Sequence, residues 1–432
     1  MEYLPIEKTF GKKGTVKVRG WIHRIRKMKD KVFIVLRDSS DVIQCVVKDP
    51  NMVKAADELL VESSLEIEGK IYKEGRAPTG YEIEVNNLNI IHNSEDFPIG
   101  KDQSPEFLLD QRHLWLRSRK MTAIMKIRST IFGAIHEYFR NKGFYEHQSP
   151  TFLSAVGESG SSVFEVNYFG KKTYLAQTWQ LHAEAMMFAL EKIYTIAPSF
   201  RAEKSSTSRH LTEYWHAEME TAWCEFKDLQ DHCEELIKHI VNKVLKENKK
   251  ELEILKRDLK TLEATSKKKF PRMTYSEVLD LLKEKANMKI PWGKDLRTVE
   301  EDKLSALFDT PVIVTDYPKK VKAFYMKESP ETMGKPEKEK TVQGFDLIGP
   351  EGYGELVGAS QREENIEVIK ANLTKEGEDL KNYQFYLDTR RYGSVPHGGF
   401  GMGVERVISW ICGLDNIKDA IAFPRTMTRM SP

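Results

Sequence analysis

Apolar and polar residues alternate in short runs through the first ninety residues of the chain. An alternation with a period of two is typical of strands that are buried on one face. Between the third and fourth runs the pattern becomes helical, over Met52–Leu60. The strands predicted in this way are Val16–Ile22, Val32–Leu36, Val42–Val47, Ser64–Tyr72 and Tyr81–Ile91.

Five strands with one helix between the third and the fourth follow the order of an OB-fold, a small β-barrel. We therefore predict an OB-fold domain over residues 1–92. The face and loops of such barrels commonly bind single-stranded nucleic acid, and an inert barrel is the alternative.

The charge of this region favours the nucleic-acid interpretation. The first fifty residues contain twelve Lys and Arg against six Asp and Glu, whereas the whole chain has a net charge of only +2. Such an excess favours a polyanion such as RNA, and a solvated basic face without a partner is the alternative. Phe33 lies in a predicted strand, where a core position is the ordinary interpretation. A nearby basic cluster makes base stacking on its ring competitive. The cluster is Arg24, Arg26, Lys27, Lys29 and Lys31.

A polar stretch follows the barrel, from Asn93 to Gln103, and contains Pro98 and Gly100. We place a linker over residues 93–119 and a second domain over residues 120–432. The second domain opens with a predicted helix, Met121–Asn141, and continues with a strand ending at Pro150. The helix is indicated by apolar residues at helical spacing. These are Ile124, Ile127, Ile131, Ile135 and Phe139.

The rest of the second domain mixes helices with short strands. Long helical runs fill the region from Lys227 to Lys285, and short strands are predicted at Val312–Thr315, Ala323–Met326 and Val342–Ile348. No regular alternation of strand and helix is visible, which argues against a parallel sheet. The predicted fold class is α+β, with a mainly antiparallel sheet flanked by helices in the second domain.

Composition excludes several classes of protein. The four cysteines are far apart and form no Cys-x-x-Cys pair, so neither a zinc knuckle nor a disulfide framework is indicated. No run of eighteen apolar residues exists, and the N-terminus lacks the features of a signal peptide. We expect a protein of the reducing cytoplasm that has no membrane partner.

Three segments of the second domain carry candidate chemistry. They are Phe-Arg-Ala-Glu at 200–203, Ser-Arg-His-Leu-Thr-Glu-Tyr at 208–214 and Gly-Phe-Gly-Met-Gly-Val-Glu-Arg at 399–406. Each alone has a plain structural interpretation, as a surface ion pair or a glycine turn. Together, and in this order after a helix and strand that end at a proline, the segments resemble the three motifs of class II aminoacyl-tRNA synthetases.

The resemblance covers about residues 15–430 and narrows to the subgroup for aspartate, asparagine and lysine. It implies that Arg201 and Arg406 are catalytic, because both would hold phosphate groups while the amino-acid carboxylate attacks ATP. Arginine suits this task, since its planar fork grips phosphate oxygens bidentately. The implied ATP-binding residues are Arg201, Glu203, Arg209, His210, Tyr214, Glu355 and Arg406.

A magnesium ion is the implied cofactor, since hard oxygen ligands suit it. Asp346 and Glu355 are the candidate ligands, with structural ion pairs as the alternative for either residue. They flank residues 349–354, which resemble the family's loop ahead of Gly-Glu-Leu-Val-Gly-Ala-Ser-Gln-Arg at 354–362.

Four residues are implied to bind the amino acid. Glu158 and Gln180 would hold its α-amino group, Arg362 its side-chain oxygen, and Glu218 its amide NH₂ group. Aspartyl enzymes typically carry a lysine where this chain has Ala183, so the pattern resembles asparaginyl-tRNA synthetases.

The resemblance implies ATP-dependent ligation of asparagine to its tRNA through an asparaginyl-adenylate, with release of AMP and diphosphate. An aspartyl-tRNA synthetase, which in some cases also charges tRNA for asparagine, is the first alternative. The others are a tRNA-independent asparagine-making enzyme and a nucleic-acid-binding regulatory protein. The tRNA-independent asparagine-making relatives lack the barrel that is predicted here. A regulatory protein without catalysis is argued against by the intact residues Arg201, Glu203, Glu355 and Arg406.

Two partners besides ATP and asparagine are implied. The tRNA for asparagine would be bound through its anticodon by Phe33, Gln44 and Arg24, which match positions that related enzymes use. A second copy of the chain would complete a homodimer, because Met121–Asn141 and the strand ending at Pro150 resemble the first class II motif, which builds the subunit interface.

Overall fold

The computed structural model describes residues 2–154, 162–203 and 209–432 of the chain. Glu158 and Ser208, named above, lie outside these residues. The chain divides into two compact units, Met1–Trp115 and Leu116–Pro432.

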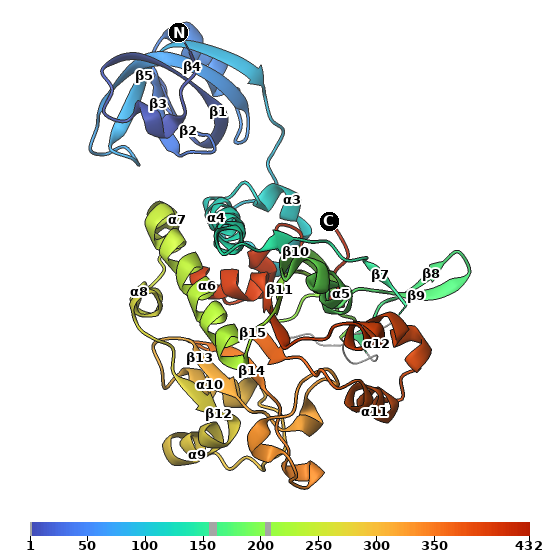
Figure 1. The fold of residues 1–432 in the computed structure, drawn as a ribbon. Coiled ribbons are helices and arrows are strands. Elements are labelled where there is room, and N and C mark those ends of the chain that lie inside the picture. Colours follow the sequence, from blue (N-terminus) through green and yellow to red (C-terminus); the bar gives the residue numbers. More distant parts are fainter. Residues whose placement is uncertain (1, 155–161, 204–208) are drawn as a thin grey trace. The chain divides into compact units, whose positions relative to one another are not determined.

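The first unit is built on a closed five-stranded barrel with the strand order β1-β2-β3-β5-β4 (Figure 1). All neighbours are antiparallel except β3 and β5. This confirms the predicted OB-fold. The strands are β1 (Gly14–Lys27), β2 (Val32–Arg37), β3 (Val42–Val47), β4 (Ser64–Lys73) and β5 (Tyr81–His92).

The helix of the barrel, α1 (Pro50–Asp57), begins and ends earlier than predicted. Its start is set by Asp49, whose carboxylate accepts hydrogen bonds from the backbone N–H groups of Asn51 and Met52, and by a proline at the first helical position. A short 3₁₀ helix, η1 (Ile6–Thr9), precedes β1. After β5 the first unit ends with two short helices, α2 (Pro105–Asp110) and α3 (Arg112–Trp115).

The second unit is organised around an eight-stranded sheet with the order β12-β13-β14-β15-β16-β11-β10-β6. Only the outermost pairs, β12 with β13 and β10 with β6, are parallel, so the predicted mainly antiparallel sheet is confirmed. The strands are β6 (Tyr145–Glu146), β10 (Lys192–Phe200), β11 (Glu213–Ala222), β12 (Arg272–Thr274), β13 (Val312–Thr315), β14 (Gly344–Gly349), β15 (Gly354–Gln361) and β16 (His397–Gly403).

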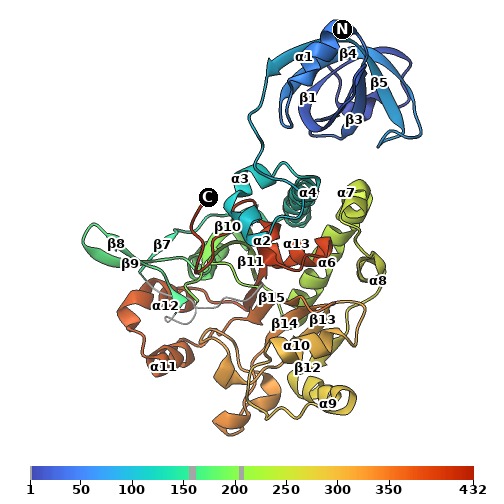
Figure 2. The same cartoon turned by 180° about the vertical axis from the view of Figure 1, so that it is seen from behind.

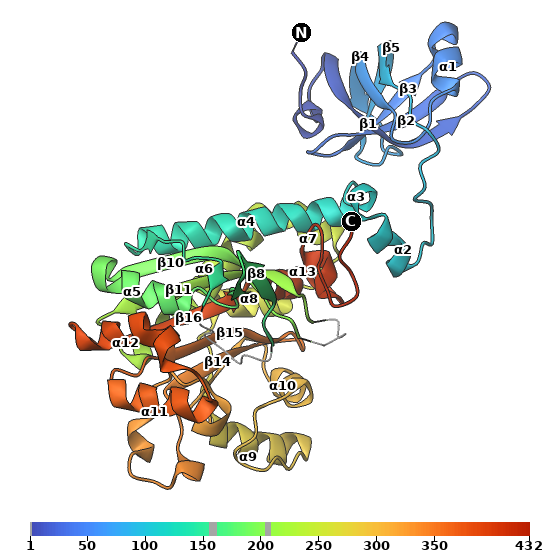
Figure 3. The same cartoon turned by 90° about the vertical axis from the view of Figure 1, so that its right-hand side faces the viewer.

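Helices cover one face of this sheet (Figure 3). The predicted first helix is present as α4 (Arg119–Asn141), which packs against α6 (Phe226–Glu247) and α13 (Val404–Cys412). The ring of Phe139 on α4 stacks on Tyr194 of β10 at 4.7 Å between centroids. On β11, Ala217 and Met219 alternate with Glu218, and Glu218 lines a cleft. The cleft therefore lies on the sheet face opposite that of Ala217 and Met219.

The remaining elements surround the sheet. Helices α9 and α10 lie beside its β12–β14 end (Figure 2). A separate three-stranded sheet has the order β7-β9-β8. These elements are β7 (Phe152–Leu153), β8 (Glu165–Tyr168), β9 (Lys171–Leu175), α5 (Gln180–Leu190), α7 (Lys249–Ile254), α8 (Lys260–Lys267), α9 (Tyr275–Ala286), α10 (Thr298–Ser305), η3 (Lys319–Val321), α11 (Ile366–Glu376) and α12 (Gln384–Arg391).

Three predicted elements differ from the structure. The strand predicted to end at Pro150 is only the two-residue β6, paired at the sheet edge with β10. The helical region 227–285 is divided into α6, α7, α8 and α9, with β12 between the last two. Residues 323–326 form no strand but a single bridge from Met326 to Arg362. The reason is that Phe324 and Tyr325 bury their rings in a cluster with Tyr383 and Tyr386.

Candidate active site

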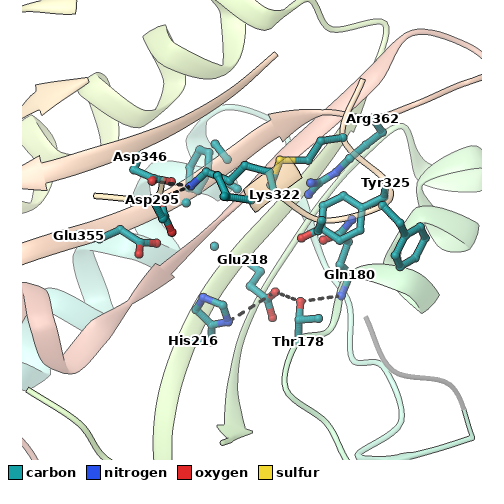
Figure 4. Close-up of a pocket in the computed structure, with 18 of the residues that line it drawn as sticks. Thr178, Gln180, His216, Glu218, Asp295, Lys322, Tyr325, Asp346, Glu355 and Arg362 are labelled. Atoms are coloured by element: carbon teal, nitrogen blue, oxygen red, sulfur yellow. Dashed lines mark hydrogen bonds and ion pairs between the residues drawn. The ribbon is translucent and has the colours of Figure 1, made fainter. Parts of the chain in front are cut away.

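A cleft of about 620 Å³ opens on the sheet face that carries Glu218. Its walls come from β11, β14, β15 and β16, from the start of α5, and from the irregular segment after η3. Figure 4 shows carboxylates gathered at one end, around Lys322, and Gln180, Tyr325 and Arg362 at the other. The two ends differ in what they can bind.

The seven residues predicted to bind ATP all line a second cavity that adjoins the cleft. The two cavities share Arg201, His216, Glu355 and Gly401. The structure therefore brings together residues that lie between β10 and β11 with residues of β11, β15 and α13, up to 205 positions apart from Arg201 to Arg406. Three arginines, Arg201, Arg209 and Arg406, line this cavity together with the Tyr214 ring. Such a set suits the binding of a nucleotide with its phosphate chain.

Individual contacts hold these residues in place. The Arg201 guanidinium lies 5.7 Å from the centroid of the Tyr214 ring. Arg209 donates to Asp302 Oδ1 at 2.8 Å, and Arg406 donates to the backbone oxygen of Glu355 at 2.6 Å. His210 Nε2 lies 3.6 Å from Glu203 Oε2.

Burial lowers the pKa of His210, and the positive charge of Arg406 lowers it further. This histidine therefore favours the neutral form, which adds no charge to a site already rich in arginine.

The glycine run of β16 has a structural reason. A Cβ at Gly399 would overlap the carbonyl oxygen of Met219, and one at Gly401 would meet the ring of His216 at about 2.5 Å. Both partners lie on β11, which pairs directly with β16. These two glycines let the two strands and the His216 ring fit together at the floor of the cleft.

The other end of the cleft holds Gln180, Glu218 and Arg362, three of the four residues predicted to bind the amino acid. Arg362 is 4% exposed and forms a two-pronged ion pair with Glu220, with Nε donating at 3.2 Å. Its Nη1 donates to Ser360 Oγ at 2.7 Å. Prediction from the sequence missed Glu220, although its position two residues after Glu218 on a strand places it on the same face.

Glu218 has a different environment. It accepts hydrogen bonds from the Thr178 hydroxyl and, at 2.9 Å, from the backbone N–H of Trp179. His216 Nδ1 lies 3.5 Å from it. Glu218 is thus held at the start of α5, whereas Glu220 is the carboxylate that contacts Arg362.

A buried charge network lies behind this end of the cleft, centred on Glu184 of α5. The Glu184 carboxylate is fully buried and accepts from Gln180 Nε2 at 2.9 Å and from Arg390 at 2.5 Å. His397 Nε2 lies 3.2 Å away. Burial alone would raise the pKa of Glu184, but Arg390 and His397 lower it below its ordinary value. Glu184 is therefore ionised, and it fixes the Gln180 side chain.

Within the Glu184 network the buried charges of the arginines and glutamates balance. Arg362 and Arg390 stand against Glu184 and Glu220, and all four side chains are buried. Burial raises the pKa of Glu220, but the Arg362 guanidinium, which donates to both of its carboxylate oxygens, opposes that rise and favours the ionised form. A neutral side chain can enter such a region without adding an uncompensated charge.

Ala183, which stands where the resemblance implied a lysine in aspartyl enzymes, packs with Trp179, Met187, Ile193 and Ala222 in an apolar cluster.

The predicted metal ligands, Asp346 and Glu355, both line the cleft. Burial raises the pKa of Asp346 to about 6. The negative charge of Glu355 adds to this rise in pKa, and the positive charge of Lys322 opposes it. Burial would also raise the pKa of Glu355, but the positive charges of Arg406 and Lys322 bring it below the ordinary value.

Two more carboxylates, Asp295 and Glu301, interact with this pair and were not predicted. Burial and the charge of Glu355 raise the pKa of Glu301 to about 7. Among the described residues, no group of three or more His, Cys, Asp or Glu side chains has the arrangement of a complete ion-binding set.

The outer face of the barrel carries the three predicted anticodon-binding residues. On β2 the side chains of Val32, Ile34 and Leu36 form the barrel core, whereas Phe33 is half-buried outside it. The Arg26 guanidinium lies 4.5 Å from the centroid of the Phe33 ring. Phe33 therefore does not lie in the barrel core, which was the ordinary interpretation of its place in a strand.

Strand pairing aligns the other two residues with this ring. Val35, the next outward residue of β2, pairs with Arg24 on β1 and with Gln44 on β3. Gln44 also donates a hydrogen bond to Glu82 on β5. The three residues thus share one outer face, across three neighbouring strands.

Residues 104–427 match the family described as tRNA synthetases class II (D, K and N), and residues 16–91 match the OB-fold nucleic acid binding domain. The asparagine–tRNA ligase of Thermococcus gammatolerans is 46% identical over 420 residues, which cover 96% of each chain. The chain belongs to the asparagine–tRNA ligase family. The asparagine–tRNA ligase of Thermoplasma acidophilum is 44% identical over 421 residues, which again cover 96% of each chain.

A solved structure agrees with this assignment. The crystal structure of asparaginyl-tRNA synthetase from Pyrococcus horikoshii complexed with asparaginyl-adenylate superposes with a TM-score of 0.94 at 40% identity. The match covers 100% of both chains.

In the described part of the chain, no helix is long and apolar enough to cross a membrane.

The charge network behind the cleft predicts that replacing either of two adjacent arginines with alanine has very different effects on stability. Arg390→Ala would leave Glu184 buried without its closest partner and destabilise the fold by about 3–5 kcal/mol. Arg391→Ala removes only a more exposed pair with Asp388, and we expect a loss below about 1 kcal/mol. Calorimetric unfolding of both variants measures the difference. Equal shifts would mean that Glu184 does not depend on Arg390.

Proposed function

We propose that this chain activates asparagine with ATP and joins it to the tRNA for asparagine. An asparagine carboxylate oxygen attacks the α-phosphorus of ATP, and diphosphate leaves. A terminal ribose hydroxyl of the tRNA then attacks the carbonyl of the adenylate, and AMP leaves. The observation that carries this proposal is the full-length match to asparagine–tRNA ligases, combined with a cleft that adjoins the cavity lined by the expected ATP-binding residues.

The proposed roles at the nucleotide end follow from charge and shape. Arg201, at the junction of the two cavities, would hold both the α-phosphate and the amino-acid carboxylate. Arg209 and Arg406 would hold the outer phosphates, Tyr214 would stack on adenine, and Glu203 would accept from its amino group. Catalysis of phosphoryl transfer is mostly positioning and charge neutralisation, which a set of arginines supplies.

Asp346 and Glu355 fit a magnesium ion that arrives with ATP. A Cβ built on Gly358 would lie 3.9 Å from Asp346 Oδ1 and 2.9 Å from Glu355 Oε1, so both oxygens border the space left by that glycine. Magnesium is commonly bound through one or two carboxylates together with substrate phosphates, which suits this pair. When bound, the ion would neutralise the phosphates.

Discrimination between asparagine and aspartate would rest on charge. Arg362 would donate to the side-chain oxygen of either substrate, but Glu220 already compensates its positive charge. A second carboxylate in the same place would meet the negative charges of Glu184, Glu218 and Glu220, while the Arg362 guanidinium is already paired with Glu220. We propose that this favours the amide over the carboxylate.

Three further features belong to the proposal. The outer barrel face would bind the tRNA anticodon, since Phe33 offers a half-exposed ring on the same face as Arg24 and Gln44. A homodimer is proposed from the resemblance of α4 and the following segment to the first class II motif. The proposed setting is the cytoplasm.

The proposal is tested by ATP–diphosphate exchange with each of the twenty amino acids, followed by charging of purified tRNA. We expect exchange with asparagine alone and ester formation only on the tRNA for asparagine. Equal exchange with aspartate would favour the aspartyl alternative. No exchange with any amino acid would contradict an enzymatic role.

We expect Glu218→Gln to weaken the rejection of aspartate more than it affects folding. The substitution removes a negative charge at the cleft but keeps an oxygen that can accept from the Trp179 N–H. The measurement is the ratio of exchange rates with asparagine and aspartate. Glu220→Gln is the comparison, because Glu220 contacts Arg362 directly. If only the second variant admits aspartate, Glu220 and not Glu218 is the discriminating carboxylate.

Phe33→Ala should reduce tRNA charging by about ten- to a hundredfold, because stacking of one base on an aromatic ring is worth roughly 1–3 kcal/mol. Amino-acid activation should not change, since the reacting groups lie in the other unit. Phe33→Tyr keeps the stacking surface and should charge normally. Thermal stability of the variants is the control, and normal charging by a folded Phe33→Ala variant would remove the anticodon role.

A further inference from the structure

The two oxygens of Asp346 face different partners. Asp346 on β14 pairs with Gly358 on β15, where the missing side chain leaves a space. Oδ1 is the Asp346 oxygen nearest to that space, which Glu355 Oε1 also borders. Oδ2 instead accepts from the Lys322 ammonium at 2.7 Å (Figure 4). The orientation of this carboxylate is thus set by a residue that the family motifs quoted above do not contain.

Lys322 is itself tightly held. Its side chain is only 12% exposed, and Nζ lies 3.8 Å from the centroid of the Tyr317 ring and 3.9 Å from Asp295 Oδ1. Tyr317 is fully buried. An ammonium fixed between a ring and two carboxylates has little freedom to swing away, since moving it would expose or unpair buried charge.

We propose that Lys322 is a positioning residue, which holds Asp346 with Oδ1 turned to the place where the divalent cation of ATP would bind beside Glu355. This inference rests on the proposed function. Without the ammonium, the Asp346 carboxylate loses the donor that holds Oδ2, and the charge of Lys322 no longer offsets the repulsion among Asp295, Asp346 and Glu355. Partners that orient a ligand in this way typically change metal affinity about ten- to a hundredfold when removed.

The test compares Lys322→Met, which keeps length but removes the charge and the donor, with Lys322→Arg, which keeps both. Binding of Mn²⁺ is measured by electron paramagnetic resonance in the presence of a non-hydrolysable ATP analogue. The Mg²⁺ concentration for half-maximal diphosphate exchange is measured alongside. We expect Lys322→Met to weaken both by about tenfold. Lys322→Arg should stay within about threefold of the wild type, a margin smaller than the loss of an orienting partner.

Binding of asparagine without nucleotide is the control, and it should be equal in all variants because Arg362 and Gln180 lie at the other end of the cleft. Unchanged Mn²⁺ binding in Lys322→Met would overturn the proposal, as would a parallel loss of asparagine binding. If Lys322→Met does not fold, Lys322→Gln carries the same comparison, and wild-type Mn²⁺ affinity there contradicts the role of the ammonium. A wild-type protein that binds Mn²⁺ with the analogue but exchanges diphosphate with no amino acid would refute the proposed function instead.

Discussion

Compensation of buried charge is the constraint on which the centre of the second unit depends. Glu184 is fully buried, and a buried carboxylate is tolerated only when cations and donors surround it. Arg390 and His397 supply that surrounding from α12 and β16, and Gln180 adds a hydrogen bond from α5. A single carboxylate thus ties three elements together behind the cleft.

The same constraint shapes what the cleft can accept. Because Glu220 neutralises Arg362, the guanidinium offers donors without a free positive charge. At the other end, the charge of Lys322 is shared between Asp295 and Asp346, and that of Arg406 reaches Glu355. One end therefore favours a neutral polar group, and the other combines carboxylates with arginines, as a phosphate chain with its cation requires.

Antiparallel pairing brings these groups together. The neighbours β14, β15, β16 and β11 are central strands of the sheet, and each carries one part of the cleft. The close fit of β16 on β11 requires glycine at 399 and 401, so the spacing between the two strands depends on residues without side chains. Helices α4, α6 and α13 cover the opposite face and leave the cleft side open.

Much of this protein was determined by the sequence itself. Period-two alternation located the five barrel strands, because each has one face in a small core, and helical spacing located α4 for the same reason. The three motifs identified the ATP-binding residues, since phosphate binding demands particular side chains at close intervals along the chain. The failed strand at 323–326 shows the limit of the pattern: Phe324 and Tyr325 are apolar because they join an aromatic cluster, not because the backbone pairs. Only the tertiary structure decided which charges meet. Lys322 and Asp346 are 24 residues apart, and Glu184 and Arg390 more than two hundred, and such pairings depend on strand order and register, which no local periodicity encodes.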